Sequence, residues 1–261
     1  MLRMNARNTQ SPSIKRDLLF LGLSSVFITA LVMGNIIGTT KFIQLLDVQL
    51  PEWLLPLVPE LVRQGERYSM AIPAGLLAFP VTFLVTDLMS ELFGRKKAQL
   101  LVIIGFFVNL FMLLVMTLNF YLPDASGVSG GAVLFDGVYG FMVGNTLGSM
   151  IAYLVAQTVD VQLFHFWKRL TKGRHLWLRN NASTMVSQLV DSTAILSILY
   201  FTGNLGDAVT GLAALAILIF NSYLFKFVSA LIDTPLCYAA VHYFRDYYED
   251  PDGYELPQRN R

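Results

Sequence analysis

Long apolar runs alternate with short polar segments along most of the chain. Each run approaches or exceeds about 18 residues, the length that an α-helix needs to cross roughly 30 Å of hydrocarbon. The pattern therefore predicts an all-α integral membrane protein, a bundle of six transmembrane helices. Its spans fall at about residues 18–43, 71–93, 100–121, 138–164, 182–201 and 211–244.

The polar segments divide the chain into three parts. Residues 1–17 form a polar N-terminal segment, residues 18–244 a six-span transmembrane domain, and residues 245–261 an acidic tail. The first apolar run is too long for a signal peptide, and further runs follow it. Residues 44–70 hold several prolines, so we expect a loop there rather than a regular span. Before the fifth span, two asparagines at positions 180–181 are suitable helix N-caps.

Composition and charge agree with this interpretation and add an orientation. Only 14% of the residues are charged, whereas a soluble domain carries about 25%. In a topology with six spans, 15 of the 19 lysines and arginines lie on one side of the membrane. They belong to the N-terminal segment, residues 95–97, residues 168–179 and the tail. Basic loops stay in the cytoplasm. We therefore expect both termini to be cytoplasmic.

Small residues recur every four positions in two of the spans. Ala30, Gly34 and Gly38 form one such ridge, and the fourth span carries another at positions 140, 144 and 148. Ridges of this kind let helices approach closely in lipid. We interpret both ridges as packing surfaces.

Several classes of protein find no support in the sequence. Cys237 is the only cysteine, so no internal disulfide can form. The three histidines lie near predicted membrane edges without the spacing of a metal site. No phosphate-binding loop, nucleophile elbow or zinc-protease motif is present. We expect a protein that is not an enzyme, with no catalytic residues, metal, cofactor or nucleic-acid partner.

Polar residues inside the spans are the candidate functional residues. The fourth span carries Gln157 and Asp160, and the fifth carries Gln188 and Asp191 at matching depth. Each Gln-x-x-Asp pair lies on one helical face. Two carboxylates at one depth in apolar sequence are costly and call for a partner or a ligand.

Three further charged residues belong to this set: Asp87, Lys226 and Asp233. Ion pairs that hold the bundle together are one explanation. Four acids in four spans exceed the one deep cation, however, which favours a ligand rich in N–H donors, or protons.

Several segments resemble the queuosine precursor transporter family, which is grouped with vitamin-uptake transporters. The resemblance covers about residues 20–245 and is carried by Asn35-Ile36-Ile37-Gly38, by FPVTFLVTDLMSELFGRKKA, by AYLVAQTVDVQLFHFWKRLT, by LWLRNNASTMVSQLVDS and by the run YLFKFVSALIDTP. It implies a multi-pass protein of the bacterial inner membrane that imports 7-cyano- and 7-aminomethyl-7-deazaguanine for tRNA modification.

The chemistry of the candidate residues fits such a substrate. A deazaguanine presents a ring N–H beside an exocyclic NH₂, and one carboxylate accepts both. Either Gln157 or Gln188 can satisfy the neighbouring carbonyl, and Tyr153 or Phe83 can stack on the ring. We expect the carboxylates of Asp160 and Asp191 to make the main contacts with the substrate. The other three charged residues should lie around the cavity.

Another function and an oligomeric assembly also stay open at this point. The chain can be the substrate-binding subunit of an ATP-driven vitamin or nucleobase uptake system, with the ridge at positions 30–38 as the docking surface. It can also form a homo-oligomer. An intramembrane enzyme would need a nucleophile and a base at one depth, and the sequence shows no such set.

Overall fold

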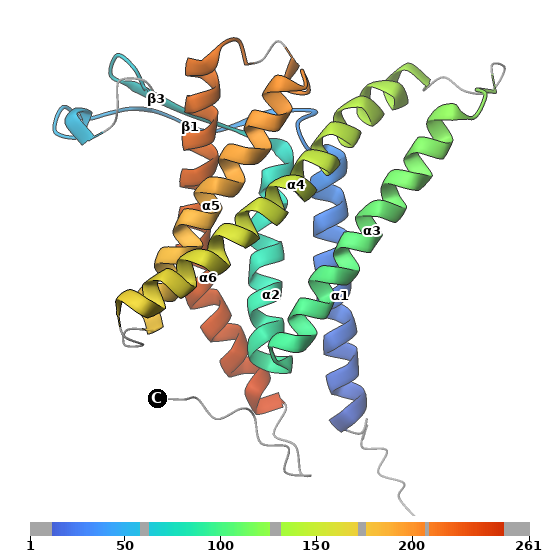
Figure 1. Cartoon of the computed structure of the whole chain (residues 1–261), viewed down its shortest axis with the longest axis vertical. Helices are drawn as coiled ribbons and strands as arrows, with labels where there is room; N and C mark the ends of the chain where they lie inside the picture. The colour runs from blue at the N-terminus through green and yellow to red at the C-terminus, as the bar shows by residue number, and fades with distance from the viewer. Residues whose placement is uncertain (1–11, 58–62, 126–131, 172–175, 207–208, 248–261) are drawn as a thin grey trace, which may run out of the picture.

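The structure, a computed structural model, describes residues 12–57, 63–125, 132–171, 176–206 and 209–247. Long helices dominate this part of the chain (Figure 1). They are α1 (Pro12–Ile37), α2 (Phe79–Phe93), α3 (Arg95–Tyr121), α4 (Ala132–Leu170), α5 (Leu176–Phe201) and α6 (Leu212–Tyr247). Across the described residues, six helical segments are long and apolar enough to span a membrane, which confirms the predicted bundle.

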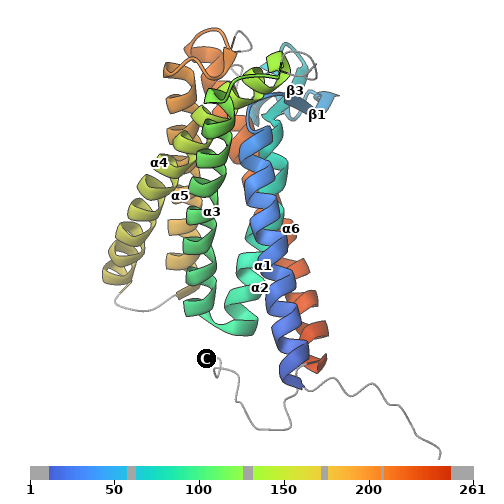
Figure 2. The ribbon, with the colours of Figure 1, turned by 90° about the vertical axis from the view of Figure 1, so that its right-hand side faces the viewer.

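Both ends of the described chain lie at the same end of the bundle (Figures 1 and 2). We call this the basic end; it holds the start of α1, the α2–α3 turn at Gly94 and the last turns of α6. The opposite end carries a small sheet, and we call it the sheet end. The up-and-down order of the helices is the arrangement that the charge pattern requires.

Three predicted boundaries are clearly wrong. The second span was expected to start near residue 71, but residues 71–73 belong to a strand and the helix α2 begins only at Phe79. The helix α1 stops at Ile37 rather than near residue 43, because the chain turns through Gly38 at φ +38° and then enters a strand. The helix α5 begins at Leu176, so Asn180 and Asn181 lie inside it and are not N-caps. A polar residue ahead of an apolar run therefore shows where the apolar sequence begins, but not where the helix begins.

Residues 44–70 are not simply a loop, as predicted, but contain most of a three-stranded antiparallel sheet. Its order is β1–β3–β2, and its strands are β1 (Phe42–Gln49), β2 (Arg63–Gln64) and β3 (Arg67–Pro73). The prolines at 51 and 56 fall in the connection, where a short 3₁₀ helix, η1 (Leu55–Leu57), lies, so they interrupt neither strand. The prolines are evidence against a regular transmembrane helix in this segment. They are not evidence against strands that they only flank.

The sheet packs against the sheet end of α6. Alternate residues of β3 are buried, namely Tyr68, Met70 and Ile72, and they contact apolar side chains of α6. The Tyr68 hydroxyl donates to Asn221 Oδ1 at 2.8 Å, and Asn221 Nδ2 donates to the Ala71 carbonyl at 3.3 Å. Burial also raises the pKa of the Tyr68 phenol.

The chain enters α2 through a 3₁₀ segment, η3 (Ala74–Ala78), which lies directly against α1. Gly75 donates its N–H to the Gly38 carbonyl at 2.9 Å. A Cβ on Gly75 would lie 2.2 Å from the Gly34 carbonyl oxygen, so only glycine permits this approach. In the ridge Ala30–Gly34–Gly38, Gly34 is thus covered by the chain's own η3 and Gly38 by Asn145 of α4, as expected for a packing surface.

The ridge on α4 contacts α5 and the segment that follows α5. A Cβ on Gly148 would lie 3.4 Å from Ile198, and one on Gly144 would lie 2.3 Å from the Asn204 side chain. The packing prediction is therefore confirmed at these two glycines. It is wrong at Gly140, where an added Cβ would meet no atom within 4 Å.

Candidate functional site: a cavity in the helix bundle

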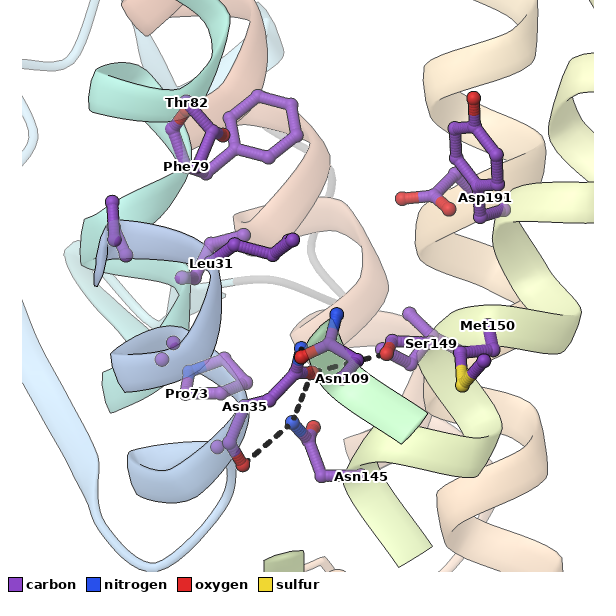
Figure 3. A pocket seen from close by; sticks show the side chains of 18 of the residues that line it. Leu31, Asn35, Pro73, Phe79, Thr82, Asn109, Asn145, Ser149, Met150 and Asp191 are labelled. Atoms are coloured by element: carbon purple, nitrogen blue, oxygen red, sulfur yellow. Dashed lines mark hydrogen bonds between the residues drawn. The ribbon is translucent and has the colours of Figure 1, made fainter. Parts of the chain in front are cut away.

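A cavity of about 640 Å³ lies inside the bundle (Figure 3). All six long helices and η3 contribute to its lining. Its volume lies within the range of roughly 300 to 1,000 Å³ that is typical of small-molecule sites. The lining is mostly apolar, and its polar side chains gather in two groups.

The first group, which we call the amide cluster, consists of Asn35, Asn109, Asn145 and Ser149 from three different helices. Asn35 Nδ2 donates to Asn109 Oδ1 at 3.1 Å. Asn35 Oδ1 accepts from Ser149 Oγ at 3.0 Å and from Asn145 Nδ2 at 3.3 Å (Figure 3). These buried amides satisfy one another, so the cluster joins α1, α3 and α4 toward the sheet end.

The second group, which we call the charged group, lies between α5 and α6. Lys226 Nζ is 2.6 Å from Asp191 Oδ2, in an ion pair that also carries a hydrogen bond. The lysine side chain is 4% exposed and the aspartate side chain 28%. Figure 3 shows the Asp191 carboxylate pointing into the cavity, on the wall opposite Phe79. The pair therefore combines a buried cation with a carboxylate that a ligand can reach.

Two serines of the charged group have hydroxyls without a protein partner. Ser192 and Ser222 both line the cavity and are nearly fully buried. No residue in the described part of the chain forms a hydrogen bond with either Oγ atom. An unsatisfied buried hydroxyl is costly. Both Oγ atoms are enclosed beside the cavity wall, so a polar ligand can satisfy either one once its side chain turns toward the cavity.

Aromatic rings line the cavity wall opposite Asp191 and close to Lys226. Lys226 Nζ lies 4.9 Å from the centroid of Phe79, within the range of a cation–π contact. The rings of Phe79 and Phe83 are 4.3 Å apart and tilted by 34°. Tyr153 of α4 also lines the cavity and is partly exposed. A flat ligand can therefore find both a polar edge and an aromatic face.

The structure brings together only some of the residues that the sequence singled out. Asp191 and Lys226 line the cavity. Gln188 is buried on α5 but is not among the lining residues. Asp87 and Asp233 lie toward the basic end of α2 and α6 and do not line the cavity either.

The remaining two candidates belong to α4. Asp160 and Gln157 lie on this helix, but their side chains are outside the described residues. The helix α4 packs along α5, as expected for antiparallel neighbours. The structure therefore describes one Gln-x-x-Asp pair and only the backbone of the other.

Several lining residues were missed by the sequence reasoning. The amides of the amide cluster stand alone in apolar runs, where a single asparagine indicates nothing about its partner. The serines at 192 and 222 are short, common residues that helices tolerate in lipid. One signal was available: an asparagine inside a span is expensive unless it is paired or functional, and each of the three spans that form the amide cluster carries one.

Metal chemistry has no support in the described part of the chain. No group of three or more His, Cys, Asp or Glu side chains within it could hold a metal ion. The cavity contains hydrogen-bonding and aromatic groups, which suit recognition of a small polar molecule.

Comparison with known proteins supports the same class. The chain is 33% identical over 183 residues to a "Probable queuosine precursor transporter" of Bacillus subtilis (strain 168), covering 69% of this chain and 76% of that protein. It is 28% identical over 150 residues to the "Queuosine precursor transporter" of Escherichia coli (strain K12), covering 54% of this chain and 65% of that protein. No solved structure matches.

A family model gives the broader assignment. The model described as "Putative vitamin uptake transporter" matches residues 73–240, which include α2 through most of α6. The matched region holds both members of the ion pair and the serines beside them. This chain belongs to the putative vitamin uptake transporter family and is a multi-pass membrane transporter.

Proposed function

We propose that this transporter imports the queuosine precursors 7-cyano-7-deazaguanine and 7-aminomethyl-7-deazaguanine. The observation that carries the proposal is the charged group, an ammonium and a reachable carboxylate side by side on the cavity wall. The names of the relatives in Bacillus subtilis and Escherichia coli support the substrate class.

The guanine-like edge has a polarity that the ion pair complements. Its carbonyl, ring N–H and exocyclic NH₂ present an acceptor followed by two donors. Lys226 supplies a donor for the carbonyl, and Asp191 supplies acceptors for the two N–H groups. The lysine thus takes the role that the sequence reasoning gave to Gln157 or Gln188. Ser192 and Ser222 also line the cavity, and their hydroxyls are candidates to bind the remaining polar atoms of the ligand.

The rest of the cavity suits the rest of the ligand. The bicyclic ring can stack on Phe79 or Phe83, or on Tyr153 across the cavity. Asp160 lies two helical turns beyond Tyr153 on α4, so it remains a candidate for the cationic 7-aminomethyl substituent. The nitrile of 7-cyano-7-deazaguanine is neutral and needs no carboxylate partner.

The orientation of the chain in the membrane is a further part of the proposal. We infer that the basic end is cytoplasmic and that the protein lies in a bacterial inner membrane. A reporter active only outside the cytoplasm should be silent when fused after Thr171 and active when fused after Asp124. The opposite pattern would overturn the orientation.

We also infer that the chain transports without an ATPase and does no chemistry on its substrate. The ridge that would dock an ATPase under the alternative function has its two glycines, Gly34 and Gly38, covered by η3 and Asn145. Co-purification of the full chain from its native membrane should therefore recover no stoichiometric ATPase. Recovery of one would favour the binding-subunit alternative.

The function is tested with proteoliposomes that contain this chain alone. Loaded with unlabelled 7-cyano-7-deazaguanine, they should take up the external labelled compound at least about tenfold faster than empty liposomes. External 7-aminomethyl-7-deazaguanine should compete. Adenine should not, because its edge presents a different order of donors and acceptors. Absence of exchange, or equal competition by adenine, would contradict the proposal.

A matched pair of variants links this exchange to the cavity. Asp191→Asn should reduce it strongly. Asp47→Asn makes the same chemical change on β1, where Asp47 is exposed and pairs with Arg67 at 3.0 Å. It should exchange at the wild-type rate.

A further inference from the structure

Asp233 is a buried carboxylate that the cavity does not use. It lies on α6, toward the basic end, and is only 6% exposed. Its Oδ2 has no hydrogen-bond partner in the described part of the chain. A carboxylate with a buried oxygen that has no donor is costly to keep charged, and binding a proton or a cation lowers this cost.

The contact between α2 and α6 surrounds this carboxylate with like charge. Asp87 of α2 is close enough to Asp233 for the two carboxylates to repel each other, and Glu91 lies one turn further along α2. Cys237 follows one turn later on α6. Among the residues that the structure describes, these are the titratable groups that face Asp233 locally.

The cation on α6 is engaged elsewhere. Lys226 lies two turns before Asp233 on the same helix and is bound to Asp191 of α5. The sheet, which also packs on α6, contributes charged residues only at the opposite end. No positive group in the described part of the chain therefore neutralises Asp233.

A polar stripe connects this carboxylate to the cavity. Ser222, Lys226, Ser229 and Asp233 follow one another at spacings of four, three and four residues, and all are buried. This spacing places them on one face of α6. On α2, Asp87 lies one turn beyond the lining residue Phe83. The seam between α2 and α6 thus leads from the cavity wall toward the basic end.

A proton suits this position better than a metal ion. Metal cations bound by oxygen need about six ligands or more. The described residues include no group of three acidic, histidine or cysteine side chains that could hold a metal. A proton needs one carboxylate oxygen, and a nearby carboxylate helps to retain it.

We propose that Asp233, assisted by Asp87, is the proton-binding site that couples substrate import to a proton gradient. The proposal rests on the transport function proposed above. One proton binds the Asp233 carboxylate in the substrate-loaded state and is released to the cytoplasm, with Asp87 as the exposed relay at the basic end. Substrate and proton are linked through α6, because this helix carries both Lys226 and Asp233 on one face.

The wild-type protein provides the first test. Proteoliposomes with a pH gradient of one unit, acidic outside and without membrane potential, should accumulate labelled 7-cyano-7-deazaguanine up to about tenfold at one proton per substrate. An internal pH dye should report acidification when substrate is added outside. Accumulation without proton movement, or driven only by a sodium gradient, would overturn the proposal whatever any variant does.

Variants then locate the site. Asp233→Asn should abolish accumulation, giving a ratio of about one, while exchange of internal for external substrate stays within about twofold of wild type. Asp136→Asn, an exposed aspartate of α4 outside the cavity, should accumulate normally. Size-exclusion chromatography in detergent should show that both are folded.

The outcomes separate this proposal from the transport function. Loss of exchange in the wild type would contradict the transport function itself. Normal exchange with gradient-driven accumulation intact in folded Asp233→Asn would contradict only the coupling site. If Asp233→Asn does not fold, Asp87→Asn serves in its place and should reduce accumulation at least threefold with exchange retained; wild-type accumulation in that variant would overturn the proposal.

Discussion

The amide cluster and the charged group line the same cavity but differ in how their polar atoms are satisfied. In the amide cluster, Asn35 forms bonds with three neighbours from two other helices. In the charged group, one ion pair stands beside two buried hydroxyls that no described residue satisfies. A self-satisfied cluster holds helices together, whereas unsatisfied groups are available to a ligand. We therefore infer that the amide cluster mainly stabilises the fold and that the charged group mainly binds the ligand.

The largest effect is expected at the ion pair. Asp191→Asn removes the only carboxylate that the structure places beside Lys226 among the described residues. Stranding this buried lysine should lower the free energy of unfolding by about 3 kcal/mol, because breaking a buried ion pair is strongly destabilising. Binding should fall by an order of magnitude or more, since hydrogen bonds to charged groups contribute about 1.5 to 3 kcal/mol each. Thermal unfolding and calorimetry on purified protein measure the two effects.

A double variant separates the two effects. Asp191→Asn combined with Lys226→Met removes both charges, so most of the lost stability should return while binding remains weak. Recovery of binding together with stability would show that the pair only supports the fold.

Next in size is the close packing that supports the amide cluster. In Gly75→Ala, the new Cβ would lie 2.2 Å from a backbone oxygen of α1, so η3 and α1 must separate. Overpacking of this kind costs about 1 to 3 kcal/mol. The matched control is Gly140→Ala, where the space is open and alanine is the better helix former by up to about 1 kcal/mol. Equal melting temperatures of the two variants would contradict the packing account.

The amide cluster itself should show a purely structural effect that is smaller than that of the ion pair. Asn109→Leu leaves Asn35 Nδ2 without its acceptor, which should cost about 1 to 3 kcal/mol of stability. Deazaguanine binding by the folded variant should change less than about threefold. A loss of binding as large as that of Asp191→Asn would erase the distinction between the two regions.

The smallest effect is expected at the unsatisfied hydroxyls. Ser222→Ala should leave stability unchanged or slightly raised, because it removes a buried polar atom without a partner. Binding should weaken by about 1 kcal/mol, or roughly fivefold, if a neutral ligand bond is lost. Thr146→Val is the control, since Thr146 also has a buried unpartnered hydroxyl but does not line the cavity. Equal binding by the two variants would remove Ser222 from the site.

The sequence predicts the features that depend on local pattern. Hydrophobic runs identify six spans because crossing a bilayer requires a fixed length of apolar helix. Glycine spacing identifies helix packing, although Gly140 shows that spacing alone does not say which glycines are in contact. The sheet was missed because the prolines beside its strands dominate the pattern.

Features that depend on partners distant in sequence could not be predicted. Asp191 is recognisable as a buried acid, but its pairing with Lys226 depends on how α5 and α6 are rotated against each other. The amide cluster combines residues 74 and 110 positions apart. A single asparagine inside an apolar helix predicts that some partner exists, not which one.

The most direct test of the central claim is an experimental structure of the protein with bound 7-aminomethyl-7-deazaguanine. The ring N–H and exocyclic NH₂ should lie about 2.7 to 3.2 Å from the Asp191 carboxylate, and the ring carbonyl within similar reach of Lys226. The ring should contact an aromatic side chain of the cavity wall. Ligand bound elsewhere, with the Asp191–Lys226 pair untouched, would contradict the account.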